Sequence, residues 1–274
     1  MRYHNRVQRS RNVGLARALS KLGYSSRSEA TELIRAGRVA LNGRPQRNPE
    51  YPVNLAQDKI SVHGRPVARR KKIYLLLNKP RGVVTTASDE QGRRTIYEFV
   101  DQKYPWLAPV GRLDKASEGL LLVTNDSEWA ARILDPENHL DKIYHVRIDA
   151  HADDALIASL IAGVRSDGEL LRAKNARVLR GGKRRAWLEI VLDEGKNRHI
   201  RRIFEQGGIR VLRLLRIAIG PLQLGDLAKG STRPLTQAEK KSLDDALVSR
   251  TKAFRAKRSP SNVRQGETGS GSAR

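Results

Sequence analysis

The chain has 274 residues, of which 39% are hydrophobic, so it can bury one core of ordinary domain size and still supply a small second module. It contains no cysteine, which excludes a disulfide framework, a thiolate-ligated zinc site and a cysteine nucleophile. The formal net charge of +24, from 53 Lys and Arg against 29 Asp and Glu, predicts a polyanionic partner.

The positive charge is concentrated towards the two ends of the chain. Residues 1–72 carry a net charge of +13, residues 73–249 carry +5 and residues 250–274 carry +6. This distribution predicts anchoring at the ends and chemistry in between. No apolar run approaches the ~18 residues of a membrane span, and the Arg-rich N-terminus lacks the apolar core of a secretory signal. We therefore expect a soluble cytoplasmic protein without membrane association.

The first part of the chain has the pattern of a small α/β module preceded by a basic flexible arm over residues 1–10. Apolar residues recur at helical spacing from 13 to 22, and Ser26 and Glu29 have the spacing of a capping box that opens a second helix. A strand over 39–41 runs into Asn42-Gly43, a pair typical of hairpin turns, and 59–62 is a second strand. We place this module at 11–69, followed by a basic linker at 70–72.

The second part is predicted to be a larger domain over residues 73–247. Strands are expected at 73–77, 119–124, 144–148, 185–192 and 211–219, and helices at 154–164, at 197–206 and after a second capping box at 236–239. Strands outnumber helices and do not alternate strictly with them, so we expect an α+β fold with a largely antiparallel mixed sheet. After about residue 248, Ser, Gly, Arg and Lys predominate, and we expect a basic disordered tail. No glycine-rich nucleotide motif is present.

Asp114 ends the segment Gly111-Arg112-Leu113-Asp114 and is followed closely by an apolar strand. A loop held by a rigid strand is a common position for a catalytic group. An Asp in such a place is more often a turn residue, however, and the spacing alone leaves both interpretations open.

Longer motifs resemble a known family. The segment 111–126 (GRLDKASEGLLLVTND) resembles the catalytic motif of the pseudouridine synthases, in the ribosomal small-subunit synthase A branch that also includes several large-subunit enzymes. Segments 77–82 (LNKPRG), 142–144 (KIY) and 194–202 (EGKNRHIRR) are similar to other family motifs, in the same order and at similar separations. Residues 26–43 (SRSEATELIRAGRVALNG) resemble the S4 RNA-binding domain, the usual companion of this catalytic domain. The resemblance covers residues 11–245.

The resemblance implies a role for each matching residue. Asp114 would be the nucleophile that attacks a flipped-out uridine, Tyr144 would stack on the uracil, and Arg112 would fill the space that the base leaves. Arg201 would pair with the Asp114 carboxylate; its neighbour Arg202 would point elsewhere, because adjacent helical residues are about 100° apart. Tyr144 could instead be a core tyrosine and Arg112 a surface cation. We see no catalytic demand for His199.

Further basic residues are candidate RNA contacts. In the catalytic cleft the candidate phosphate contacts are Lys79, Lys196, Arg198 and Arg216. In the S4-like module they are Arg17, Arg27, Arg35 and Arg38. Each of the four cleft side chains could equally be a solvated surface charge, and the alternative for the S4-like module is a basic solvated helical pair without a ligand.

The sequence thus predicts isomerisation of uridine to pseudouridine in ribosomal RNA, with the large subunit favoured, by a monomer that uses no metal or organic cofactor. The first alternative is a non-catalytic S4-type protein of rRNA binding or ribosome assembly. The second is another RNA-modifying enzyme such as a methyltransferase, against which the missing glycine-rich cofactor loop argues. The sequence does not identify the uridine.

Overall fold

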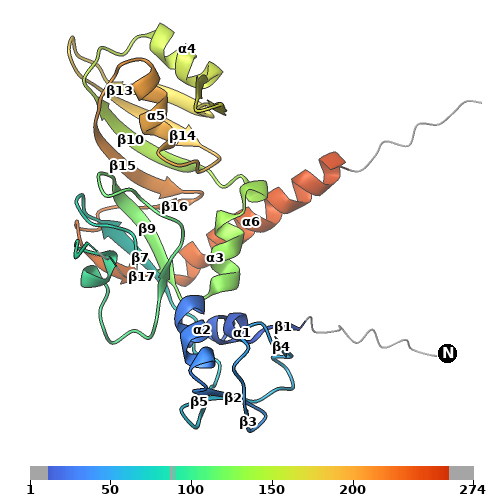
Figure 1. Cartoon of the computed structure of the whole chain (residues 1–274). Coiled ribbons are helices and arrows are strands. Elements are labelled where there is room, and N and C mark those ends of the chain that lie inside the picture. Colours follow the sequence, from blue (N-terminus) through green and yellow to red (C-terminus); the bar gives the residue numbers. More distant parts are fainter. Residues whose placement is uncertain (1–11, 87–88, 90, 259–274) are drawn as a thin grey trace, which may run out of the picture.

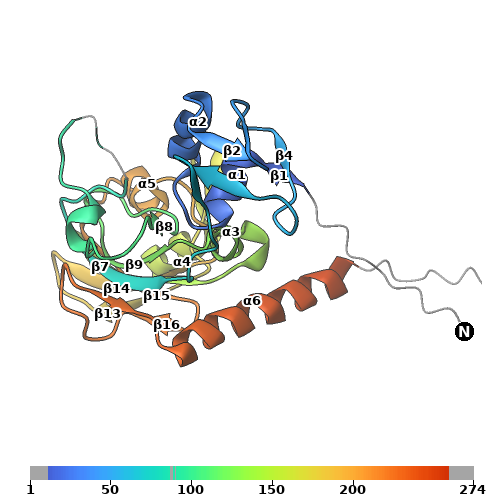
Figure 2. The same ribbon diagram turned by 90° about the horizontal axis from the view of Figure 1, so that it is seen from below.

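The computed structural model describes residues 12–86, 89 and 91–258; the expected N-terminal arm lies outside the described residues. Figure 1 shows a small N-terminal domain below a large sheet, with one long helix projecting to the side. Seen from below, the N-terminal domain and the start of this helix lie on opposite sides of α3 (Figure 2). The expected α+β class is confirmed by the order of the elements.

The N-terminal domain packs two helices on a small antiparallel sheet of order β3-β2-β5-β6. Ser26 caps the second helix, accepting a hydrogen bond from Glu29 N at 3.0 Å, and Asn42 has the positive φ of 51° that the hairpin requires. The elements are β1 (Val13–Gly14), α1 (Leu15–Lys21), α2 (Arg27–Arg35), β2 (Val39–Leu41), β3 (Arg44–Pro45), β4 (Pro52–Val53), β5 (Ile60–Val62) and β6 (Arg65–Pro66).

The second domain is built on a nine-stranded sheet with the main order β13-β14-β10-β15-β9-β7-β17. Its strands are β7 (Tyr74–Lys79), β8 (Ala108–Pro109), β9 (Glu118–Thr124), β10 (Lys142–Ile148), β13 (Asn175–Arg180), β14 (Ala186–Leu192), β15 (Val211–Ile219), β16 (Leu222–Gln223) and β17 (Thr232–Pro234). The remaining elements are η1 (Ile96–Phe99), α3 (Ser127–Leu134), η2 (Pro136–Asn138), α4 (Asp154–Ala162), a separate hairpin β11 (Val164–Ser166) and β12 (Glu169–Leu171), α5 (His199–Gln206) and α6 (Gln237–Arg258).

Among the described strands, β9 and β15 form the one parallel pair of this sheet, so the expected largely antiparallel mixed sheet is confirmed. The central strands β7 and β9 each contain a run of buried apolar residues, Leu75 to Leu77 and Leu120 to Val123. Leu120 and Leu122 pack towards α3 and α6, whereas Leu121 and Val123 face η1 and the loops on the other side. Burial on both faces explains why these strands read as continuous apolar runs rather than alternating ones.

The last helix extends past the predicted domain boundary at residue 247, because α6 continues to Arg258. Its first turns dock on the domain through the buried Leu243 and Leu247, and Asp244 accepts a hydrogen bond from the indole nitrogen of Trp129 at 3.0 Å. Residues 259–274 of the expected tail lie outside the described residues. No helix in the described part of the chain is both long enough and apolar enough to cross a membrane.

The linker between the domains is hydrogen-bonded to both of them. Asn125, which is fully buried, accepts from Ile73 N and donates to the Lys71 carbonyl, each at 2.9 Å. Lys72 donates to the Lys21 carbonyl at 3.1 Å. These contacts fix the N-terminal domain beside α3.

The parallel pair allows no side chain at Gly119. This residue has a φ of +105°, and a Cβ there would lie 2.3 Å from the Arg216 carbonyl oxygen of β15. Gly119→Ala is expected to lower the free energy of unfolding by more than about 3 kcal/mol, because backbone strain and a backbone clash add. Urea unfolding followed by circular dichroism measures this loss.

The control is Gly181→Ala, where the nearest atom to the new Cβ is a methyl group of Val178 at 3.9 Å. This variant should change the stability by less than about 1 kcal/mol. Equal effects of the two substitutions would contradict the importance of the close approach between β9 and β15.

Candidate active site

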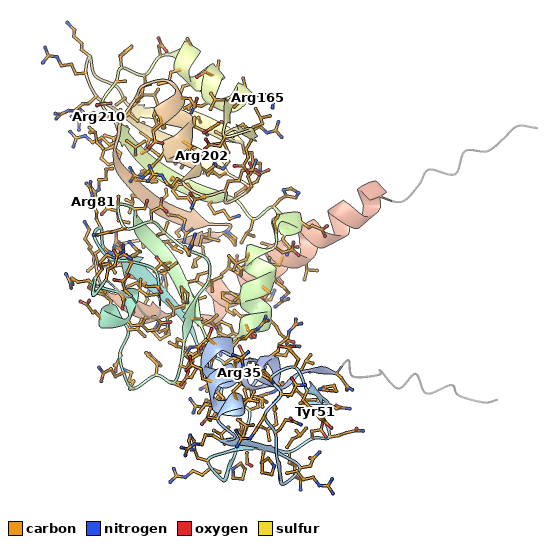
Figure 3. All side chains as sticks on the ribbon, in the orientation of Figure 1. Arg35, Tyr51, Arg81, Arg165, Arg202 and Arg210 are labelled. Atoms are coloured by element: carbon orange, nitrogen blue, oxygen red, sulfur yellow. The ribbon has the colours of Figure 1, made fainter. Side chains whose placement is uncertain are left out.

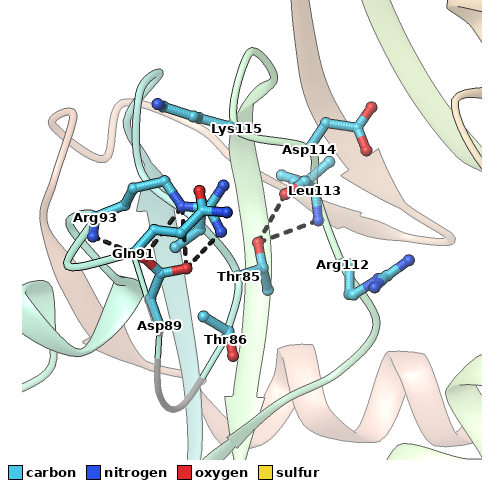
Figure 4. Close-up of a pocket in the computed structure, with 10 residues that line it drawn as sticks. Thr85, Thr86, Asp89, Gln91, Arg93, Arg112, Leu113, Asp114 and Lys115 are labelled. Carbon is cyan, nitrogen blue, oxygen red and sulfur yellow. Dashed lines mark hydrogen bonds and ion pairs between the residues drawn. The ribbon is translucent and has the colours of Figure 1, made fainter.

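The loop that carries Asp114 joins β8 to β9 and is anchored by the residue before it. Leu113 is buried, and both its backbone groups bond to the Thr85 hydroxyl: Leu113 N donates at 3.3 Å, and the hydroxyl donates to the Leu113 carbonyl at 2.7 Å (Figure 4). A turn follows, in which Ser117 N donates to the Asp114 carbonyl at 2.9 Å. With its backbone held inside, the loop turns the Asp114 carboxylate outward.

Lys79 lies beneath the same loop, in a position that does not suit the expected contact with a phosphate. The side chain is completely buried at the end of β7. Its ammonium group donates to three carbonyl oxygens, those of Pro80 at 3.0 Å, Asp114 at 3.2 Å and Ser117 at 2.8 Å. Burial lowers the pKa of Lys79 to about 8, although Asp114 and Glu118 act in the opposite direction. Lys79 is therefore bonded to the backbone of the Asp114 loop from the interior of the domain.

A cleft of about 560 Å³ lies on one side of Asp114. Its walls come from the Asp114 loop, α3, β10, β15 and the segment that leads into α5. The lining side chains include Arg112, Asp114, Ser117, Lys142, Tyr144, Lys196, Arg198, His199, Leu214 and Arg216. A second hollow of about 430 Å³ lies on the other side of Asp114, next to Thr85 and Arg93 (Figure 4).

Tyr144 and Asp114 both line the larger cleft of about 560 Å³, and Arg112 lies at its edge. The Tyr144 ring is half-buried on β10 and packs against two of the hydrophobic cores. Arg112 is exposed and borders both hollows. A planar base that entered the cleft would meet an aromatic ring and a carboxylate.

Arg201 does not form the expected ion pair with Asp114. Its guanidinium instead donates to the carbonyls of Ala116, at 3.1 Å, and Val211, at 3.3 Å. Burial and the nearby Arg198 lower the pKa of Arg201, while Asp114 raises it, so the two charges lie close without direct contact. Arg202 points the other way and pairs with Glu169 at 2.7 Å. The Arg201 side chain thus contacts the backbone of the Asp114 loop, at the Ala116 carbonyl, and not the Asp114 carboxylate.

The other predicted cleft residues differ in exposure. Arg198 is exposed and pairs with Glu205 at 2.7 Å, and Lys196 donates to the Leu170 carbonyl at 2.8 Å at the rim of the cleft. His199 is buried, and neither ring nitrogen has a hydrogen-bond partner among the described residues. Arg216 is only 6% exposed, a position that does not suit the expected contact with a solvated phosphate.

Sequence reasoning missed two groups that shape the site. Thr85 clamps Leu113, as described above. Glu118, buried at the start of β9, pairs with Arg213 at 2.5 Å and Lys229 at 2.7 Å. Burial alone would raise the pKa of Glu118, but these two cations hold it below its usual value. The signal in the sequence was the unusual position of a carboxylate next to an apolar strand.

The four S4-like cations Arg17, Arg27, Arg35 and Arg38 are all exposed on the N-terminal domain, and none forms an ion pair with a described residue. Figure 3 labels Arg35 on this domain. Within the described residues, no group of three or more His, Asp or Glu side chains is arranged to hold a metal ion.

Comparisons with known proteins agree with this architecture. A family profile described as RNA pseudouridylate synthase matches residues 73–206, and an S4 domain profile matches residues 13–60. An uncharacterized RNA pseudouridine synthase of Aquifex aeolicus is 37% identical over 83% of this chain and 92% of its own length. The ribosomal large subunit pseudouridine synthase B of Bacillus subtilis is 35% identical over 84% of this chain and 94% of its own length.

A solved structure of a pseudouridylate synthase superimposes with a TM-score of 0.60 at 30% identity, covering 84% of this chain and 99% of the other. The chain belongs to the RNA pseudouridine synthase family and carries an S4 domain in front of the catalytic domain. It is therefore an RNA-modifying isomerase, and the resemblance read from its motifs is confirmed.

Lys79→Met tests whether this residue positions the loop. Removing the ammonium takes a hydrogen-bond donor away from the carbonyls of Pro80, Asp114 and Ser117, so Asp114 should lose its orientation. Pseudouridine formation at saturating enzyme should fall by about 100-fold or more, while affinity for RNA in filter binding should stay within about twofold.

The matched control is Lys196→Met at the rim of the same cleft, which should weaken RNA binding more than it slows the reaction at saturating enzyme. If Lys79→Met lost affinity and kept its saturated rate, Lys79 would be a phosphate contact after all.

Proposed function

We propose that this protein isomerises a uridine of large-subunit ribosomal RNA to pseudouridine, with Asp114 as the nucleophile. The single observation that carries the assignment of Asp114 is its position: an anchored loop presents its carboxylate in a cleft that also holds the Tyr144 ring. The large subunit is favoured by the similarity to the Bacillus subtilis synthase, whose name refers to that subunit.

The reaction needs a base outside its stack. Unstacking costs a few kcal/mol, and stacking on an aromatic ring supplies roughly 1–3 kcal/mol per base. Tyr144 offers that ring, and the exposed Arg112 would fill the gap in the RNA with a planar cation. The Asp114 carboxylate would then attack C1′ as the N1–C1′ bond breaks, and after the uracil turns C5 would displace the carboxylate from C1′ and so release Asp114. The C5 proton is lost and N1 gains one, so the net change is an isomerisation.

The S4 domain supplies a second contact with RNA. Its four exposed arginines have no carboxylate partner among the described residues and are free to neutralise phosphates. Every residue of the candidate site lies on one chain, so a monomer in the compartment where ribosomes are assembled suffices for this function.

Mapping of pseudouridines in rRNA tests the assignment of Asp114. Cells that lack the protein should lack a pseudouridine in the large-subunit rRNA, and the wild-type gene should restore it. Asp114→Asn, which keeps the size of the side chain but not its charge, should restore none. Restoration by this variant would remove Asp114 as nucleophile, and a missing site in the small subunit would correct the proposed substrate.

The role of the S4 domain predicts a change in the salt dependence of RNA binding. Replacing Arg17, Arg27, Arg35 and Arg38 together by Gln should make the slope of log K against log salt shallower by about 3, because fewer counterions are released. Filter binding to a large-subunit rRNA transcript between low and moderate salt measures the slope.

A control with the same loss of charge replaces four cations that pair with neighbouring carboxylates, namely Arg94, Lys103, Arg210 and Lys241. It should change the slope much less. Equal slopes for the two fourfold variants would argue against anchoring by the S4 domain.

A further inference from the structure

Arg216 is a buried cation whose hydrogen-bonding capacity is largely unused. It is 6% exposed, and its Nε donates to the Leu120 carbonyl at 2.8 Å. Its Nη2 is buried without a partner, and neither terminal nitrogen bonds to any described residue. A buried donor left without an acceptor is costly, and more so when it is charged. An acceptor that arrives with a ligand would remove this cost.

The place of Arg216 in the sheet puts it next to Tyr144. In the antiparallel pairing of β15 with β10, Arg216 lies directly opposite Tyr144. Such partners have Cβ atoms about 5 Å apart, so both side chains can reach one ligand. Leu214, two residues earlier on the same face of β15, also lines the cleft. A ring stacked on Tyr144 would therefore present an edge to Arg216.

A second unpartnered group adjoins the same wall. Ser117 is 2% exposed, lines the cleft, and its hydroxyl has no hydrogen-bond partner among the described residues. Its carbonyl is held by Lys79, and Arg216 pairs in parallel register with Gly119, two residues further on. The Arg216 guanidinium and the Ser117 hydroxyl are thus two buried polar groups on the cleft wall where β9 pairs with β15.

The chemistry of the two groups fits an imide edge better than a phosphate. Arginine offers donors and no acceptor, whereas a serine hydroxyl can donate or accept. Uracil presents two carbonyl oxygens with N3–H between them, but cytosine carries an amino donor in place of O4. Phosphates of the bound strand would stay at the mouth of the cleft, near the more accessible Lys196 and Arg198.

We propose that Arg216 donates from its terminal guanidinium nitrogens to a carbonyl oxygen of the flipped uracil, while the Ser117 hydroxyl accepts from N3–H. The pair forms a subsite that selects the imide edge of the base. This proposal rests on the proposed function and adds to it the groups that recognise the base.

The first experiment separates base recognition from phosphate binding. Large-subunit rRNA transcripts labelled with [5-³H]uridine release tritium when C5 joins C1′, and the single-turnover rate is measured with enzyme in excess. Arg216→Met should lower this rate by about 10- to 100-fold, the range for a hydrogen bond from a charged donor, with RNA affinity within about twofold of wild type. A raised dissociation constant with an unchanged saturated rate would overturn the proposal.

Two further variants serve as controls for the comparison of rate and affinity. Arg210→Met, which removes an exposed cation at the far end of the domain (Figure 3), should leave the rate unchanged. Thermal unfolding of Arg216→Met should give a Tm no lower than wild type, because most of the guanidinium donors have no partner to lose. If Met is not tolerated, Arg216→Lys, which keeps the charge but not the planar donors, gives the same comparison of rate against affinity.

The second experiment is a chemical double-mutant cycle. Once the modified position is mapped, transcripts are ligated that carry 2-thiouridine or 4-thiouridine there, so that the weaker acceptor sulfur replaces one carbonyl oxygen at a time. In the wild type, sulfur at the contacted position should slow the reaction about tenfold; in Arg216→Met the same replacement should have no further effect.

The outcomes of this cycle distinguish the two levels of the proposal. Coupling at O4 would also explain discrimination against cytidine, whereas coupling at O2 would locate the contact on the other carbonyl; both support the subsite. If the effects of the thio substitution and of Arg216→Met were additive at both positions, and the wild type were active, the proposed role of Arg216 would be overturned while the proposed function would stand. A wild type that releases no tritium from any large-subunit transcript would instead overturn the proposed function, and the subsite with it.

Discussion

Three carbonyl oxygens converge on the buried ammonium group of Lys79, and two of them belong to the loop that carries Asp114. An ammonium group without water is costly, and the three hydrogen bonds offset that cost. Because the loop carbonyls turn inward to meet Lys79, the Asp114 side chain must turn outward. The orientation of the candidate nucleophile is thus set from the interior of the domain, by a side chain that is completely buried.

The close approach of β9 and β15 brings the rest of the site to this loop. These strands are parallel, so the start of β9, just after Asp114, lies beside the middle of β15. The antiparallel neighbour of β15 then places Tyr144 next to Arg216. At the start of β9, the buried Glu118 carboxylate pairs with Arg213 and Lys229. The catalytic loop and the proposed base-binding wall therefore lie next to each other where β9 pairs with β15. Gly119 allows the two strands to approach this closely.

Local patterns in the sequence were sufficient for the elements but not for their long-range contacts. The capping boxes at Ser26 and Thr236 and the Asn42 turn predicted where helices and a hairpin begin, because these signals act within a few residues. The end of α6 was missed, since a polar composition is also compatible with an exposed helix. The sequence offered Lys79 as a candidate phosphate contact and gave no sign of its burial, because two of its partners lie 35 and 38 residues away along the chain.

The absence of a direct Arg201–Asp114 ion pair among the described contacts bears on how the site would react. A guanidinium bound to both oxygens of the Asp114 carboxylate would occupy the lone pairs that a nucleophile needs. It would also stabilise the negative charge of the carboxylate before the attack and so slow the reaction. With Arg201 held by the carbonyls of Ala116 and Val211, its charge still acts on Asp114 through a short distance of protein interior. The oxygens of the Asp114 carboxylate then stay open to the sugar or the base, and the Arg201 guanidinium lies close enough to stabilise negative charge that develops on the substrate.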